Sequence, residues 1–282
     1  MSEAVFSRSI IHKKRKIFYL ETNPKIERTL VFVHGFTGSH LGIKDLALSF
    51  SDYRVIVFDL PGCGYSEKLD TPHTLAEFAE FLGAMRVRLN LQKATFVGHC
   101  YGGMVCTYFF SKYGIENDLI LLAPFPEFKP ELRNYLVSAF YGVAGVLPQA
   151  TANRLLRSRH VSQRVFESLL RSGDEQARQV AIAAAESERE FYERDIILQT
   201  FNDFKRLKHL DRLASKVKAE VLLVVGGQDA LSRPKHVLAS YGTIPNKQVV
   251  TLPRAGHIMQ IENIAELNTL LGDWLRQRAE SE

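Results

Sequence analysis

Short apolar runs rich in β-branched residues alternate along this chain with longer segments that have a helical period. Runs such as 30–34 and 221–225 are apolar almost throughout, as buried strands of a parallel sheet are. Strands that alternate with helices indicate an α/β fold, with helices covering both faces of a mostly parallel sheet. The predicted strands are 10–12, 17–20, 30–34, 54–59, 95–98, 119–123, 221–225 and 248–252, and the predicted helices are 41–51, 74–90, 102–113, 233–241 and 261–277.

The alternation stops between residues 125 and 205, where the pattern is helical and lacks a convincing strand. Leu132, Leu136 and Phe140 belong to one such helical pattern, which Pro148 ends. We expect this segment to be a helical cap over the carboxyl-terminal edge of the sheet, where open α/β sheets bind ligands. The predicted organisation is a core formed by 1–124 and 206–282, with a cap at 125–205.

The composition indicates a globular protein without a disulfide framework. Of the 282 residues, 46% are hydrophobic and 24% are charged, which is ordinary for a soluble domain. No apolar run approaches the roughly 20 residues that a membrane span needs, and no signal-peptide pattern is visible. The three cysteines are an odd number without CxxC spacing, which favours a reducing compartment. We therefore expect a cytoplasmic location and no membrane span.

The net charge of +5 is mild, and the only basic patch is the run at residues 12–16. That run is compatible with a nucleic-acid or anionic-membrane contact, but a solvated turn between two strands is the favoured interpretation. The histidines show no metal-ligand spacing, and no P-loop or dinucleotide fingerprint is present. We expect no nucleic-acid partner, no metal and no cofactor.

The central chemical motif is Gly98-His99-Cys100-Tyr101-Gly102, which lies between a predicted strand and a predicted helix. A nucleophile at such a turn needs small residues two positions before and after it, so that the backbone segments can pass. The positive end of the helix dipole favours a thiolate at Cys100. A small buried cysteine on a glycine-rich turn is the alternative interpretation.

Three further motifs follow predicted strands and offer the partners that a nucleophile needs. The loop His34-Gly35-Phe36-Thr37-Gly38 would supply the backbone N–H of Phe36, which together with that of Tyr101 would form an oxyanion hole. Asp229 follows the strand at 221–225, and His257 lies in the loop after the last strand. Each residue alone is equally compatible with a turn or loop role. The order of nucleophile, acid and histidine at strand ends favours a Cys100–His257–Asp229 triad.

Together these motifs resemble the α/β-hydrolase superfamily over nearly the whole chain. The segment 59–66 is similar to the family's D-x-P-G-x-G-x-S, and the segment 98–103 is similar to its nucleophile elbow. The resemblance implies an eight-stranded sheet with residues 125–205 as a cap. Most members have serine where this chain has Cys100, although dienelactone hydrolases and polyhydroxyalkanoate synthases also use cysteine. No wider match to either group is visible, and the sequence leaves open whether Cys100 is native or replaces a serine.

These residues indicate a hydrolase that cleaves an ester, thioester or related carbonyl substrate through an acyl-enzyme on Cys100. An acyltransferase or lyase that uses the same triad and a noncatalytic ligand-binding member are the alternatives. The expected partner is a small-molecule acyl substrate of apolar character, held by aromatic residues of the cap. The substrate's identity and the oligomeric state are not readable from the sequence. The expected pocket residues are Phe125, Phe128, Tyr135 and Phe140.

Overall fold

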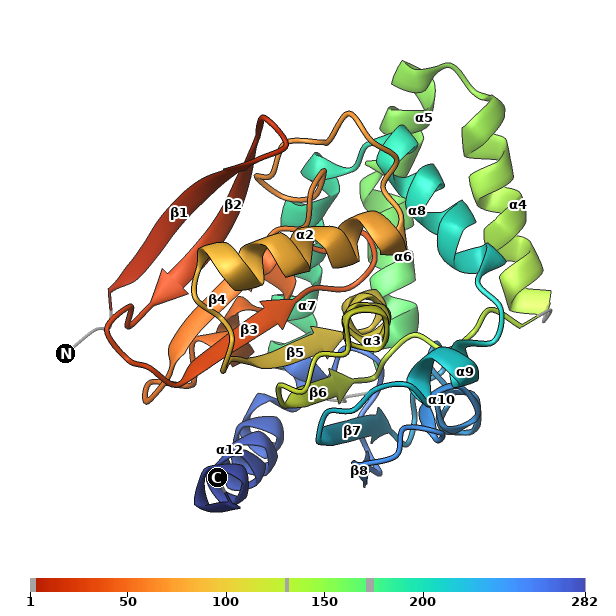
Figure 1. Ribbon diagram of the computed structural model, residues 1–282. Helices are drawn as coiled ribbons and strands as arrows, with labels where there is room; N and C mark the ends of the chain where they lie inside the picture. The colour runs from red at the N-terminus through yellow and green to blue at the C-terminus, as the bar shows by residue number, and fades with distance from the viewer. Residues whose placement is uncertain (1–3, 130–131, 171–174, 282) are drawn as a thin grey trace.

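An eight-stranded sheet forms the centre of the computed structural model, which describes residues 4–129, 132–170 and 175–281 (Figure 1). The strand order is β1-β2-β4-β3-β5-β6-β7-β8. Strand β2 pairs antiparallel with β1 and β4, and every other neighbouring pair is parallel, which confirms the predicted mostly parallel sheet. The strands are β1 (Val5–His12), β2 (Arg15–Thr22), β3 (Thr29–Val33), β4 (Arg54–Phe58), β5 (Thr95–His99), β6 (Leu119–Leu122), β7 (Val221–Gly226) and β8 (Lys247–Leu252).

Helices cover both faces of the sheet because successive side chains of a strand point to opposite sides. In β3, Val31 and Val33 belong to one core cluster, and Leu30 and Phe32 belong to the other. The first cluster is completed by α2 (Leu75–Arg88), α3 (Tyr101–Tyr113), α9 (Leu210–Ala214) and α10 (Pro234–Tyr241). The second is completed by α1 (Lys44–Ala47), α11 (Met259–Glu262) and α12 (Ile264–Ser281).

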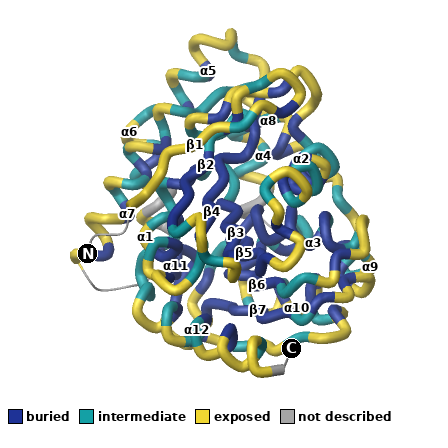
Figure 2. Tube along the Cα trace, turned by 60° about the vertical axis from the view of Figure 1, so that its left-hand side comes forward, coloured by how far each residue is buried: buried dark blue, intermediate teal, exposed yellow. Residues whose placement is uncertain are grey.

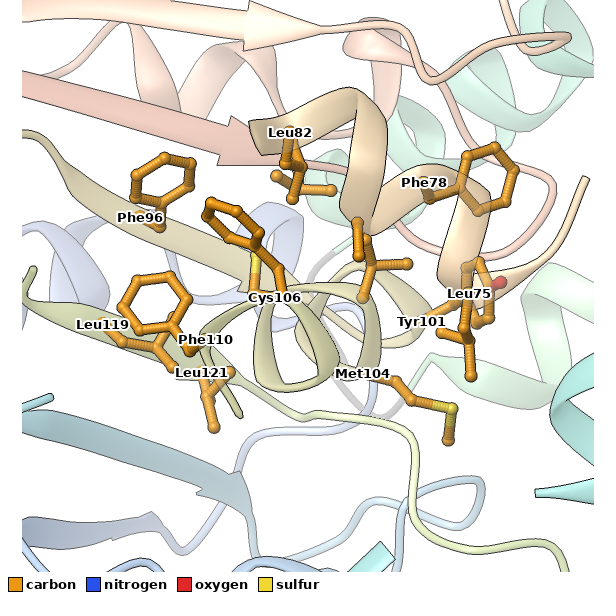
Figure 3. Close-up of a cluster of buried hydrophobic side chains, with 14 of the residues drawn as sticks. Leu75, Phe78, Leu82, Phe96, Tyr101, Met104, Cys106, Phe110, Leu119 and Leu121 are labelled. Atoms are coloured by element: carbon orange, nitrogen blue, oxygen red, sulfur yellow. The ribbon is translucent and has the colours of Figure 1, made fainter. Parts of the chain in front are cut away.

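Helix α3 is buried along most of its length. Figure 3 shows Phe110 and Cys106 of α3 near Phe96 of β5 and Leu121 of β6, and Phe78 of α2 beside Tyr101 at the start of α3. The trace coloured by burial shows the same strands as a continuous buried centre, surrounded by helices with exposed outer faces (Figure 2). Helix α3 begins directly after β5, so this packing fixes the turn that carries Cys100.

The basic run at 12–16 lies at the tip of the β1–β2 hairpin, which agrees with the favoured interpretation of a turn between two strands. Lys13 and Lys14 have φ values of 47° and 66°, and His12 pairs with Arg15 across the turn. Positive φ at both central positions is what a two-residue hairpin turn requires. The Lys13 ammonium lies 2.5 Å from a carboxylate oxygen of Glu77, so an acidic neighbour matches part of this charge.

Two predicted helices differ from the structure. The segment 41–51 contains only a 3-10 turn, η1 (His40–Gly42), and the four-residue α1, because successive turns bring Phe50 onto the sheet without a longer helix. The predicted helix 261–277 is divided at Asn263, whose φ of −129° and ψ of 33° are not helical. The Asn263 carbonyl accepts the amide of Leu267, so this residue ends α11 and begins α12.

The segment between β6 and β7 is helical. Its described part, with gaps at 130–131 and 171–174, contains no strand. Figure 1 shows these helices beyond the arrowheads of β3 and β5, which is the carboxyl-terminal edge of the sheet. We therefore treat residues 125–205 as the proposed cap. Its elements are α4 (Leu132–Val146), α5 (Gln149–Leu156), α6 (Arg159–Leu169), α7 (Glu175–Glu188), the 3-10 turn η2 (Arg189–Phe191) and α8 (Arg194–Arg206).

Candidate active site

Cys100 occupies a sharp turn between β5 and α3. Its φ of 52° and ψ of −117° lie in a region that residues other than glycine rarely adopt, so the surrounding structure must hold this conformation. Its amide donates to the carbonyl of Leu122 at 3.0 Å, and its carbonyl accepts the amide of Phe125 at 2.9 Å. The side chain is 5% exposed. The turn therefore presents a nearly buried thiol at the end of the central strand.

The two glycines of the motif allow the backbone segments to pass. A Cβ atom on Gly102 would lie 2.2 Å from the carbonyl oxygen of Val33, and one on Gly98 would lie 2.7 Å from that of Gly102. Both distances are far below van der Waals contact, and backbone atoms cannot yield as a flexible side chain can. The expectation that this turn needs small residues on both sides of Cys100 therefore has a steric basis.

We predict that Gly102→Ala lowers the free energy of unfolding by about 1–3 kcal/mol, because the new methyl group overpacks the β3–α3 contact. Urea denaturation followed by circular dichroism measures this change. The matched control is Gly142→Ala on exposed helix α4, where a Cβ meets nothing within 4 Å. That control is expected to gain up to about 1 kcal/mol from helix propensity. Equal effects at the two sites would contradict the steric argument.

His257 and Asp229 meet after the last two strands. The Nδ1 atom of His257 lies 2.8 Å from Oδ2 of Asp229 and donates to it, and each residue is 3% exposed. The other carboxylate oxygen, Oδ1, accepts the amides of Leu231 and Ser232, each at 2.7 Å. These contacts fix both the position of the carboxylate and the side of the ring that faces it.

The electrostatics of this pair favour ionised forms. Burial alone would raise the pKa of Asp229, but the charge of His257 and the hydrogen bonds from His257, Ser232 and Leu231 lower it overall. Burial alone would lower the pKa of His257, but the charges of Asp229 and Cys100 and the side-chain hydrogen bonds with both raise it overall. The imidazole is therefore hydrogen-bonded to Asp229 and close enough to Cys100 for the thiol to raise its pKa.

The loop after β3 packs directly against the thiol. A Cβ atom on Gly35 would lie 3.1 Å from Cβ of Cys100 and 3.7 Å from its Sγ. His34 braces this loop, because its Nδ1 donates to the carbonyl of Gly35 at 2.9 Å and its Nε2 accepts the amide of Leu60 at 3.0 Å. Tyr101 is the first residue of α3, where amides have no partner within the helix. An oxyanion hole formed by Phe36 and Tyr101 remains a proposal.

His99 lies beside the proposed base and is hydrogen-bonded to its backbone. Its Nε2 donates to the carbonyl of His257 at 3.0 Å, and the two rings lie 5.2 Å apart. Burial first, and then the nearby His257, lower the pKa of His99 to about 3, so its ring is neutral. The His99 side chain therefore serves to hold the loop that carries His257.

A cavity of about 480 Å³ opens between the thiol and the cap. Cys100, His257, Phe36 and Tyr101 line it, and so do three of the four predicted pocket residues, Phe125, Phe128 and Phe140. The remaining walls are mostly apolar and come from the cap and the loops around the sheet edge. They include Leu136, Val137, Tyr141, Val161, Leu169, Phe201, Phe204, Leu231, Ile258 and Ile261.

Tyr135 does not line the cavity, which corrects its predicted place in the pocket. It is 62% exposed on α4. The helical period turns Val137, Phe140 and Tyr141 towards the cavity and leaves Tyr135 on the opposite side. Aromatic character alone did not distinguish the two faces of this helix.

Residues of α8 are part of the pocket that sequence reasoning missed. Phe201 and Phe204 line the cavity and are each 3% exposed. Together with Ile197 and Thr200 they form one buried face at helical spacing, a signal that was visible in the sequence. Glu188, at the end of α7, is an unexpected polar residue in this lining.

Neither a metal cluster nor a membrane-spanning helix accompanies this site in the described part of the chain. Among those residues, no group of three or more His, Cys, Asp or Glu side chains is arranged to hold a metal ion. The helices that the structure describes do not include one that is both long enough and apolar enough to cross a bilayer.

Comparison with known proteins identifies a family. A family model described as alpha/beta hydrolase fold matches residues 28–264. The chain is 26% identical over 257 residues to the dihydrolipoyllysine-residue acetyltransferase component of an acetoin cleaving system from Pseudomonas putida, covering 88% of this chain and 63% of that protein. It is 25% identical over 273 residues to a proline iminopeptidase from Lactobacillus delbrueckii subsp. lactis, covering 87% and 89%.

A solved structure shows the same fold. The chain matches a carboxylesterase from Bacillus subtilis with a TM-score of 0.77 and 18% sequence identity, covering 98% of this chain and 92% of that one. At this identity the likeness is one of fold alone. The chain spans 63% of the Pseudomonas putida relative and 32% and 37% of two other curated relatives. The activities of those whole proteins therefore do not transfer with the match.

Proposed function

The chain belongs to the alpha/beta hydrolase fold family, and from this premise we propose that it cleaves esters or thioesters through Cys100, His257 and Asp229. One observation supports the proposal: Cys100 and His257 line the same mainly apolar cavity, and the His257 ring is hydrogen-bonded to the buried Asp229 carboxylate. This is the arrangement that a nucleophile, a base and an orienting carboxylate require.

In the proposed reaction the proton of Cys100 passes to the imidazole of His257, a transfer that the raised pKa of His257 favours, and the sulfur attacks the carbonyl carbon of the substrate. The C–S bond forms as the carbonyl π electrons move to oxygen; the resulting oxyanion then re-forms the carbonyl, the bond to the leaving group breaks, and His257 gives the proton to the leaving group. The backbone N–H groups of Phe36 and Tyr101 would stabilise the oxyanion. Water then attacks the thioester with His257 as base, and the carboxylic acid leaves as the thiol is restored.

The cavity supports an apolar acyl group as substrate. Its walls are mainly aromatic and aliphatic side chains, including Phe125, Phe128, Phe140 and Phe204. A volume of about 480 Å³ is in the range of pockets that take small organic ligands. The proposed partner is therefore a small-molecule ester or thioester.

Intact mass spectrometry tests the proposed nucleophile. The protein is exposed to p-nitrophenyl acetate, butyrate and octanoate and to the matching acyl thioesters, then digested to locate the adduct. We expect an acyl mass gain on Cys100. Cys63→Ala and Cys106→Ala serve as controls and should keep the gain, because burial raises the pKa of both thiols. Two results would count against Cys100 as the nucleophile: turnover of the ester with no adduct on the protein in any sample, or an adduct on another residue.

Acyl transfer is the second candidate, and the match to an acetyltransferase component favours it. A thioester intermediate is chemically suited to an acceptor other than water. Adding primary amines or thiols to the ester reactions distinguishes the two outcomes. Free acid in every reaction would support hydrolysis, and an amide or a new thioester formed by the enzyme would support transfer.

A further inference from the structure

The cap places a buried carboxyl group on the loop that carries Phe36. Glu188 ends helix α7, is 3% exposed, and lies 149 positions along the chain from its partner. Its Oε1 accepts the backbone amide of Ser39 at 2.9 Å and the Ser39 hydroxyl at 3.3 Å. A Cβ atom on Gly42 would lie 2.7 Å from the same oxygen, so a side chain there would displace the carboxyl group from this position.

A second buried carboxyl group holds the same loop from the core. Asp59 follows β4 and is fully buried. Its Oδ1 accepts the backbone amide of His40 at 2.6 Å, and the His40 ring nitrogen Nδ1 lies 2.9 Å away. Consecutive amides, those of Ser39 and His40, are therefore bound by one carboxyl group from the cap and one from the core. The loop between them and the thiol is strained, because Thr37 has a φ of 57°.

Burying the Glu188 carboxyl group has a large desolvation cost, which packing alone does not offset. Its hydrogen-bond partners at Ser39 are neutral, and a buried carboxyl group needs compensation for lost hydration. Burial raises the pKa of Glu188 to about 8, although the hydrogen bonds from Ser39 and Gly42 act in the opposite direction. The titratable groups that interact with it are Asp59, Cys63 and Tyr192.

We propose that Glu188 is a positioning residue, which acts through Ser39 to hold the β3–η1 loop so that the Phe36 amide faces the nucleophile. The inference rests on the proposed function, because it assigns a role to the proposed oxyanion hole. Its consequence is that the cap helps to complete the site: Glu188 binds the loop at Ser39, and the Phe36 ring packs against Tyr141 and Phe204 of the cap. Glu188 also lines the cavity, but its hydrogen bonds to Ser39 direct the carboxyl group to the loop and not to the triad.

The test compares Glu188→Ala with Glu188→Gln, which keeps an acceptor oxygen at the same position. We expect Glu188→Ala to lower kcat for p-nitrophenyl butyrate by about 10- to 100-fold with little change in KM, since a displaced oxyanion donor acts mainly in the transition state. Glu188→Gln should stay within about threefold of the wild type. Glu186→Ala is the matched control, a carboxylate on the same helix that pairs with Arg159 at 2.6 Å.

Hydrogen exchange of residues 34–42, followed by mass spectrometry, supplies a readout that does not depend on turnover. We expect these amides to exchange at least about tenfold faster in Glu188→Ala and to be unchanged in Glu188→Gln and Glu186→Ala. Unchanged exchange in Glu188→Ala overturns the proposal, and so does faster exchange with an unchanged kcat. A rise in KM alone would overturn it as well, and would make Glu188 a substrate contact instead.

Two further arms separate the possible failures. Ser39→Ala removes the hydroxyl donor from the loop side, and it should give a smaller loss of kcat of about 3- to 10-fold. If Glu188→Ala does not fold, Ser39→Ala tests the Glu188–Ser39 contact in its place. A wild-type kcat in Ser39→Ala would then overturn the proposal. If the wild type cleaves no ester at all, the proposed function fails, whereas the exchange comparison still decides whether Glu188 holds the loop.

The protonation of Glu188 predicts a pH-dependent stability. Its pKa of about 8 in the folded protein exceeds the ordinary value of 4.5, so only the folded state holds this proton between those pH values. The associated stability is complete below pH 4.5 and is lost as the pH rises through 8. The Tm of the wild type relative to Glu188→Gln should therefore fall between about pH 5 and pH 8.5. A Tm difference between the two proteins that does not change with pH would contradict the inference that Glu188 is buried in its neutral form.

Discussion

Cys100→Ala is expected to lower kcat for p-nitrophenyl esters by at least about a thousandfold while the protein stays folded. The substitution removes the only atom of this residue that can attack a carbonyl, and the base and its carboxylate are left without a nucleophile. The loss in free energy of unfolding should be within about 1 kcal/mol, since one small side chain replaces another. Steady-state kinetics and urea denaturation measure the two quantities.

Cys106→Ala is the matched control for this experiment. Cys106 is a fully buried thiol on the same helix, α3, but it belongs to the core between that helix and the sheet (Figure 3). Its replacement should cost stability and leave kcat within about twofold. Full ester turnover by Cys100→Ala would exclude the triad, and the remaining explanation would be chemistry elsewhere or a noncatalytic member of the family.

Asp229→Asn is expected to lower kcat by roughly 10³- to 10⁴-fold, because it changes which ring nitrogen of His257 carries the proton. Oδ1 of Asp229 accepts two backbone amides, from Leu231 and Ser232, so the amide oxygen of the variant would remain there. The new NH₂ group would then face Nδ1 of His257, which must accept instead of donate. The imidazole proton would move to Nε2, and that nitrogen could no longer take the proton of Cys100.

Asp203→Asn provides the comparison for Asp229→Asn. The Asp203 carboxylate also accepts a backbone amide, that of Leu75 at 2.7 Å, but it has no part in the proposed triad. Its variant should keep kcat within about threefold. An Asp229→Asn enzyme that retains more than a tenth of the wild-type kcat would show that His257 does not depend on this carboxylate for orientation.

The sheet and the order of the motifs were predictable because they depend on local patterns. A strand buried on both faces must be apolar at nearly every position, as β3 and β7 are, and each of the eight predicted runs overlaps a strand of the observed sheet. The steric need for Gly98 is likewise local in origin, since a Cβ atom there would meet the backbone of Gly102 and Gly103, where the strand turns at once into a helix. The segment 41–51 was predicted less well, because burial of its apolar residues is achieved there by turns as well as by a helix.

Contacts between distant segments were not predictable in the same way. Tyr135 and Phe140 are both aromatic residues of one cap helix, and only the packing of α4 over the cavity separates an exposed ring from one that lines the pocket. No pattern in the sequence predicts the hydrogen bonds between Glu188 and Ser39. A buried glutamate and a solvated one look alike until the partner is placed beside it.

The order of the residues along the chain determined the fold class and which side chains stand at the strand ends, because hydrophobic periodicity and glycine positions act over a few neighbouring residues. The tertiary structure decided which of those side chains meet, and it shifted the pKa values of His257, His99 and Glu188. Burial and pairing of charges arise only when segments far apart along the chain exclude water together.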